Sequence, residues 1–133
     1  MTSSNEGFPN ALVEGMALGL APVSVNCMTG PAEILVEGGD AASLRQWFGN
    51  QVKEGNLPVK YGEYGILVPV MDSERNLNPK QISEEERNMA EIIIKLMGDE
   101  EELARYRQAA ARRARCFTYE KYVEQFLALA QNL

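Results

Sequence analysis

The chain has 133 residues, two cysteines and no histidine, and 45% of its residues are hydrophobic. This length and apolar content fit one domain with a real core. The formal net charge of −6 argues against a nucleic acid or an anionic membrane as the main partner. Without histidine, a Ser/His/Asp triad, a Cys/His dyad and the commonest zinc ligand sets are excluded.

Cysteine spacing and hydropathy indicate the compartment. Cys27 and Cys116 are far apart in the sequence and form no CxxC motif, so we expect two reduced thiols rather than a disulfide or a metal knuckle. No stretch reaches the ~18 apolar residues of a membrane span, and the N-terminus lacks a basic region followed by an apolar one. We therefore expect a soluble, cytoplasmic, globular protein.

The first predicted elements are a helix and a strand. A polar stretch over residues 1–5 leads into a turn, and Pro9 can open a helix because its ring already holds a helical φ. Apolar residues then recur with helical spacing for about three turns, up to Gly19. Residues 22–25 predict a short strand.

The middle of the chain predicts a second helix and a second strand. Pro31 opens the helix, and Gly38 ends it. Residues 40–64 mix charges, glycines and scattered aromatics, so we expect an irregular connection in which residues 43–48 form one or two helical turns. The apolar run over residues 65–70 is typical of a parallel strand buried on both faces.

The remainder of the chain predicts helices. Ser83 with Glu86, and Asp99 with Glu102, have the spacing of capping boxes, each directly before a helical apolar stripe. Thr118 predicts the N-cap of the last helix. The expected inner face of this helix consists of five apolar side chains: Tyr122, Val123, Phe126, Leu127 and Ala130.

This order of elements is that of a doubly wound parallel α/β domain. Only two strands are convincing, or three if residues 1–4 preserve the end of another. Two parallel strands cannot bury both faces or satisfy their edges alone. We therefore expect residues 1–133 to be a single partial domain, either a fragment or half of a sheet that a second copy or another protein completes.

The sharpest local pattern is a turn followed by a helix start. If the helix begins at Pro9, the N–H groups of three residues have no acceptor within it: Asn10, Ala11 and Leu12. Together with the helix dipole, they form a site for an anion such as a diphosphate. Gly7 lets a ligand approach the backbone without meeting a side chain.

Two carboxylates flank this helix start. Glu14 lies four residues after Asn10 on the same helical face, and Glu6 precedes it in the turn. Carboxylates repel an anion but accept hydrogen bonds from hydroxyls, which a nucleotide sugar carries on both sides of its diphosphate. Spacing alone is a weak signal, because a solvated turn residue and a surface helix residue explain the same pair.

The wider string resembles the retaining nucleotide-sugar glycosyltransferases of the GT-B type, which are built from two Rossmann-like domains (glycosyltransferases group 1, family 4-like). Glu6 and Glu14 match the E-x7-E pair of that family. The resemblance follows the chain in order over nearly its whole length, through residues 6–17, 29–34, 65–70 and 117–120.

The resemblance implies a role for each position of the motif. Glu6 would be the catalytic position, in contact with hydroxyls of the transferred sugar, and Glu14 would bind the ribose of the nucleotide. The backbone between them would first follow the transferred sugar and then present amides to the diphosphate. The donor-binding positions would be Gly7, Phe8, Pro9, Asn10, Ala11, Leu12 and Glu14.

The family transfers a sugar with retention at the anomeric carbon and generally without a metal, so the resemblance implies no cofactor beside the nucleotide-sugar substrate. Fixed hydrogen-bond donors would stabilise the leaving diphosphate. The chain resembles only the last third of such an enzyme. The expected fold class is therefore α/β, a partial doubly wound parallel sheet (the second half of a Rossmann-like C-terminal domain) with C-terminal helices.

Two hypotheses for the function follow. The first is the donor-binding region of a glycosyltransferase of polysaccharide or glycolipid synthesis, which needs a nucleotide-sugar donor and the missing N-terminal acceptor domain or a second chain, but no nucleic acid. The second is an inactive half-domain that only binds, or dimerises through its open sheet edge. A nucleotide-sugar epimerase of the same two-domain fold is a distant third, because such enzymes use histidine.

Other residues have both a structural and a functional interpretation. Glu33 suits a helix start, or it lies near the substrate. Trp47 and Phe48 suit core anchors, or a platform for a sugar. Five arginines late in one helix suit a solvated face, or a peripheral contact with anionic lipids at the inner membrane: Arg105, Arg107, Arg112, Arg113 and Arg115.

Overall fold

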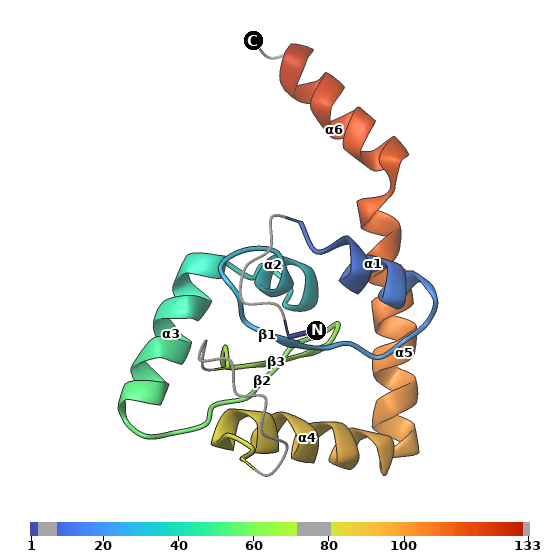
Figure 1. The fold of residues 1–133 in the computed structure, drawn as a ribbon. Helices are drawn as coiled ribbons and strands as arrows, with labels where there is room; N and C mark the ends of the chain where they lie inside the picture. Colours follow the sequence, from blue (N-terminus) through green and yellow to red (C-terminus); the bar gives the residue numbers. More distant parts are fainter. Residues whose placement is uncertain (3–7, 72–80, 132–133) are drawn as a thin grey trace.

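The computed structural model describes residues 1–2, 8–71 and 81–131. Its first elements are α1 (Asn10–Ala17), β1 (Val23–Val25), α2 (Pro31–Leu35), α3 (Ala41–Lys53), β2 (Lys60–Tyr61) and β3 (Ile66–Val68). Then follow α4 (Glu84–Met97), α5 (Glu100–Ala114), the 3₁₀ turn η1 (Arg115–Phe117) and α6 (Tyr119–Gln131). In Figure 1 the small sheet lies in the middle, with α1 and α2 above it, α4 below it and α5 along one side. The molecule is thus a layered α/β domain, compatible with part of a Rossmann-like domain.

The sheet is mixed, with the strand order β1-β3-β2. β3 pairs parallel with β1, in the register Val23↔Ile66, and antiparallel with β2, in the register Tyr61↔Ile66. The expectation of a parallel sheet is therefore correct for β1 and β3 and wrong for β2. A two-residue strand carries no alternating pattern, and β2 forms because a tight hairpin brings it to the free edge of β3.

The outer edge of β1 is paired with the first residue of the chain. The Met1 amino group donates to the Val23 carbonyl at 2.6 Å, and the Val25 amide donates to the Met1 carbonyl at 3.0 Å. Met1 therefore takes the place that a neighbouring strand takes in a larger sheet. Of the predicted strand remnant over residues 1–4, residues 3 and 4 lie outside the described part of the chain.

Two apolar clusters fill the two sides of the sheet. Leu67 belongs to the cluster under α1, α2 and α3, whereas Ile66 and Val68 belong to the cluster over α4. All three β3 side chains are buried, at 0–1% exposure. This confirms the prediction of a strand buried on both faces.

Helix α3 corrects the expectation of an irregular connection over residues 40–64. The Asp40 carboxylate accepts a hydrogen bond from the Ser43 amide at 2.7 Å and so caps a helix of 13 residues. Phe48 anchors one face of this helix in the core. Gly49 costs about 1 kcal/mol in a helix interior, which is not enough to end a helix that is packed on one side.

The caps of the later helices largely follow the sequence. Ser83 and Glu86 form the predicted capping box, each accepting a hydrogen bond from the backbone of the other. Asp99 caps α5 by accepting from the Glu102 amide at 3.0 Å. The Glu102 carboxylate, however, binds both Nε and Nη2 of Arg105, so the second predicted capping box is only half formed.

Helix α6 overturns the prediction of a buried inner face. The Lys121 amide lies 3.4 Å from the Thr118 hydroxyl, as expected of an N-cap, yet none of the described α6 side chains is buried. Tyr122 and Phe126 are 66% and 59% exposed. Figure 1 shows why: α6 points away from the body of the molecule, so no described element covers its apolar stripe.

Candidate functional site

The start of α1 lies against the loop that leaves the carboxyl end of β1. Gly30, in this loop, has a φ of +96°, and a Cβ atom added there would lie 2.4 Å from Cδ of Pro9. Pro9 is itself fully buried. The glycine therefore allows the loop after β1 and the turn before α1 to pack in direct contact. In open α/β sheets, ligands bind at this carboxyl edge.

The helix begins one residue later than expected, because Pro9 is its N-cap rather than its first helical residue. The Asn10 amide donates to the Phe8 carbonyl at 2.9 Å, and the Leu12 amide donates to the Pro9 carbonyl at 3.0 Å. For the Ala11 amide, no acceptor is found among the described residues. Of the three amides that the sequence suggests for an anion, two have acceptors within the turn and would have to exchange or share them.

The outer face of α1 carries the polar residues of the motif. Leu12 and Met16 are buried, whereas Asn10, Ala11 and Glu14 are exposed. Asn10 and Glu14 are separated by one helical turn, so an amide-bearing helix start and a carboxylate share one accessible face. Glu6 and Gly7, the other half of the predicted motif, lie outside the described residues.

Helix α5 and the η1 turn that follows it contact the chain on both sides of α1. The sequence does not predict these contacts. Beyond the end of α1, Nε of Arg107 donates to the Gly19 carbonyl at 2.9 Å. Before its start, the ring of Phe8 lies 5.8 Å from the ring of Phe117. These contacts join residues about 90 and about 110 positions apart in the chain, and no local pattern signals such a pairing.

The cluster of arginines is mainly structural. Arg107 binds Gly19, Arg105 pairs with Glu102, and Arg113 donates to two carbonyls of α2. Three of the five arginines therefore have partners within the chain, although Arg105 and Arg107 are exposed, as expected of a solvated face. The alternative of a contact with lipid headgroups stays a hypothesis for the exposed Arg112 and Arg115.

The other side chains singled out in the sequence have structural positions. The Glu33 carboxylate accepts from the Gly30 amide at 2.7 Å, which confirms its place at a helix start. Phe48 is buried in the core, as expected of a core anchor, whereas Trp47, which meets its ring edge-on at 4.9 Å, is 41% exposed. Neither cysteine forms a disulfide with a described residue: Cys27 is buried and Cys116 is exposed.

Asn26 adds an unexpected buried polar group at the end of β1. Its backbone amide continues the sheet by donating to the Val68 carbonyl at 2.8 Å. Its side chain is only 4% exposed, and neither its Oδ1 nor its Nδ2 atom has a partner among the described residues. An unsatisfied buried amide costs about 1–3 kcal/mol. The Asn26 side chain is therefore a costly buried polar group at the carboxyl edge of the sheet.

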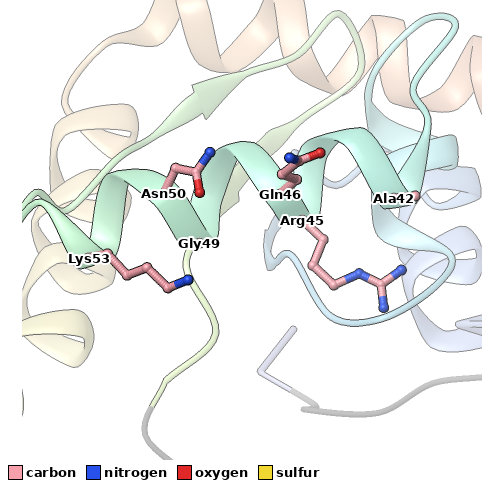
Figure 2. A pocket seen from close by; sticks show the side chains of 6 residues that line it. All are labelled: Ala42, Arg45, Gln46, Gly49, Asn50 and Lys53. Carbon is pink, nitrogen blue, oxygen red and sulfur yellow. The ribbon is translucent and has the colours of Figure 1, made fainter.

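Two of the hollows that the described residues line bear on where a site lies. One, of about 550 Å³, is next to the site and is lined by Phe8, Cys116, Phe117, Thr118, Tyr119, Tyr122 and Gln125. The other lies along α3, on the side of the molecule opposite α5. Figure 2 shows that a single helix supplies its lining, with Arg45 and Lys53 extending to one side and Gln46 and Asn50 to the other. The α3 hollow therefore adds nothing to the site at α1.

The described part of the chain contains neither a cluster of metal-binding side chains nor a helix that could span a membrane. No group of three or more His, Cys, Asp or Glu side chains lies close enough to hold a metal ion. No helix is both long and apolar enough to cross a membrane.

Comparison with known proteins gives two similarities. Over 96% of its length the chain is 33% identical to an uncharacterized glycosyltransferase of Methanocaldococcus jannaschii, of which it covers 29%. Over 99% of its length it is 29% identical to an exopolysaccharide phosphotransferase of Streptomyces coelicolor, of which it covers 10%. The chain thus spans less than a third of either relative. No family model and no solved structure matches it.

These similarities support a relationship with a glycosyltransferase-like family.

Proposed function

We propose that this chain is the donor-binding part of a retaining glycosyltransferase of the GT-B type, which transfers a sugar from a nucleotide sugar during polysaccharide or glycolipid synthesis. The observation that carries the proposal is the start of α1. It lies at the carboxyl edge of the β1–β3 pair and exposes Glu14 one turn further on. The similarity to a protein named as a glycosyltransferase supports the same reading.

In this proposal the ligand lies along the exposed face of α1. Glu14 accepts hydrogen bonds from the two ribose hydroxyls, which suits an exposed carboxylate on a helix with no basic partner in its own last turn. The Ala11 amide is the first donor that a diphosphate oxygen would meet. Glu6 would contact hydroxyls of the transferred sugar, with the backbone of residues 7–9 alongside it.

The chemistry requires little of the side chains. Transfer breaks the bond between the anomeric carbon and the diphosphate oxygen, and a new bond forms from that carbon to the oxygen of an acceptor hydroxyl, whose proton passes to the leaving diphosphate. Negative charge grows on the leaving diphosphate as the bond breaks. The helix dipole and the Ala11 amide, which has no acceptor among the described residues, would stabilise that charge, whereas the amides of Asn10 and Leu12 would first have to exchange or share their present acceptors. A histidine is not needed for this role.

Nucleotide binding tests the proposal directly. Titration of the chain with UDP, GDP and ADP in a calorimeter, with EDTA present, should show binding of at least one of them. Replacing Glu14 by Gln weakens hydrogen bonds to two hydroxyls, so we expect about a 10- to 100-fold higher Kd. The matched control is Glu91→Gln, which changes an exposed glutamate of α4 and should leave the Kd unchanged.

The competing function is an inactive module that only binds or dimerises through its open sheet edge. It predicts no affinity for any of the three nucleotides and a dimer in sedimentation experiments. Because Met1 already pairs with the outer edge of β1, a dimer through that edge would first have to displace it. Equal nucleotide affinity in the Glu14→Gln variant would remove the ribose role from Glu14.

A further inference from the structure

Arg113 of α5 lies where three separate elements meet. Its Nη2 atom donates to the Glu33 carbonyl at 2.8 Å, and its Nε atom donates to the Ile34 carbonyl at 3.2 Å. Both carbonyls belong to the last turn of α2, where unpaired backbone oxygens and the helix dipole favour a cation. One guanidinium group thus fastens α5 to the end of α2.

The same guanidinium also contacts two aromatic rings. Its central carbon lies 4.9 Å from the ring centre of Tyr64 and 5.2 Å from that of Phe117. Tyr64 is itself held in place, since its hydroxyl donates to the Glu37 carboxylate at 3.0 Å and its backbone amide donates to the Leu35 carbonyl at 3.0 Å. Only a planar group with several donors can bind two carbonyls and two rings at once.

Two routes lead from Arg113 to the turn before α1. Along the first, Phe117 contacts Phe8, with 5.8 Å between ring centres and a tilt of 52°. Along the second, the helix that Arg113 holds at its end, α2, carries at its start the Gly30 that packs directly on Pro9. The routes use different elements and reach consecutive residues of the motif.

We propose that Arg113 is a positioning residue: it holds the Phe8–Pro9 turn, and through that turn the first amides of α1, in the geometry that a diphosphate needs. The consequence for binding rests on the proposed function, whereas the positioning of the turn does not. Arg113 itself touches no ligand in this scheme. Its loss lets the turn move while the core under α1 stays intact, because that core consists of apolar contacts by Leu12 and Met16.

The experiment follows the Phe8 ring by ¹⁹F NMR. The chain has four phenylalanines, so incorporation of 4-fluorophenylalanine yields four signals, and Phe8→Leu assigns one of them. In Arg113→Lys the charge is kept but the planar contact is lost, so the Phe8 signal should move while that of Phe48, on α3, stays in place. Arg112→Lys, the exposed neighbour on the same helix, should move neither.

Nucleotide titration of the same variants separates the two proposals. We expect Arg113→Lys to raise the Kd of whichever nucleoside diphosphate binds best by about three- to tenfold, and Arg112→Lys to leave it unchanged. If the Phe8 signal moves but the unaltered chain binds no nucleotide, the positioning role stands and the proposed function fails. If the chain binds and Arg113→Lys binds equally well, the consequence for the ligand is refuted.

An unmoved Phe8 signal in folded Arg113→Lys overturns the inference. Circular dichroism shows whether the variant is folded. Should it unfold, Phe117→Leu replaces it, since that change removes the ring contact with Phe8 but keeps both hydrogen bonds of Arg113. The Phe8 signal should then move and the Kd should rise; an unchanged signal and Kd would contradict the first route.

Discussion

At the scale of single residues, the contact between Gly30 and Pro9 determines how the site is assembled. A backbone with a φ of +96° is strained for any residue with a side chain, and the space where a Cβ would lie is filled by the proline ring. A glycine at this position therefore serves two purposes, conformation and close approach. The Gly-Pro pair in the sequence indicates the special backbone conformation, but it does not indicate the close approach to Pro9.

Replacing Gly30 by Ala should lower the free energy of unfolding by about 2–4 kcal/mol, because strain and the clash with Pro9 add together. Gly55→Ala is the matched control: its φ is +78° and nothing lies within 4 Å of the added Cβ. There we expect a loss of only about 1–2 kcal/mol, from strain alone. Urea unfolding of both variants measures the difference. Equal losses would show that Pro9 moves aside without cost.

A second residue-scale effect is the dependence of stability on pH through Glu63. The Glu37 backbone amide donates to its carboxylate at 2.8 Å, which lowers the pKa of Glu63 from its ordinary value of 4.5. A depressed folded-state pKa stabilises the fold above the unfolded pKa, and this stabilisation is lost as the pH falls through the folded value.

Glu63→Gln should therefore destabilise the protein at pH 7 but not at a pH below the folded-state pKa. The carboxylate is solvent-exposed, so we expect an effect of less than about 1 kcal/mol. Unfolding midpoints of the two proteins at pH 7 and near pH 3 provide the comparison. A difference that is the same at both values would assign the effect to side-chain shape rather than charge.

At the scale of elements, α6 differs most from the others. Its sequence has a well-formed apolar stripe, and its start follows Thr118 as predicted, yet the stripe meets no other described element. Tyr122 and Phe126 stack on each other, with 6.5 Å between ring centres, instead of entering a core. Periodicity therefore predicted the helix correctly, while burial depended on a neighbour that the described residues do not provide.

A chain that ends after Thr118 should consequently be as stable as the whole, within about 1 kcal/mol, because no described side chain of α6 is buried. Thermal and urea unfolding of the shortened and complete chains test this. Removing the helix also removes the wall of the hollow beside Phe8 that Tyr119, Tyr122 and Gln125 form. A loss of several kcal/mol would mean that α6 packs onto the body in solution.

Helix α5 is the element that organises the site. Its apolar side packs under α1, Arg107 holds the segment after α1, and the Arg113–Phe117 pair reaches the turn before it. The arginines were interpreted as a surface feature because cations near the end of a helix usually are. Arg107 and Arg113 bind carbonyls of segments about eighty to ninety residues earlier in the chain. Sequence spacing does not predict such contacts.

At the scale of the whole molecule, the domain is a piece of a sheet with helices on both faces. Both faces of the central strand β3 are covered, each by a different apolar cluster. β2 is the strand at one edge of the sheet, and the strand at the other edge, β1, is met by Met1. The two proteins to which the chain is similar are much longer, since the chain covers 29% and 10% of them.

The sequence by itself determined the helices that carry their own stop and start signals, and the buried parallel pair of strands. Ser83, Asp99 and Pro31 mark helix starts through local hydrogen bonds and ring geometry, and the run over residues 65–70 is apolar throughout. These signals are local, so they can be read without the fold.

Only the tertiary structure decided what those elements meet. β2 exists because β3 offers it an edge, the amides of Asn10 and Leu12 turn back to Phe8 and Pro9, and the apolar stripe of α6 stays in contact with solvent. The physical reason is the same in each case: a hydrogen bond or an apolar contact between distant segments depends on which partner is within reach, and the local sequence does not contain that partner.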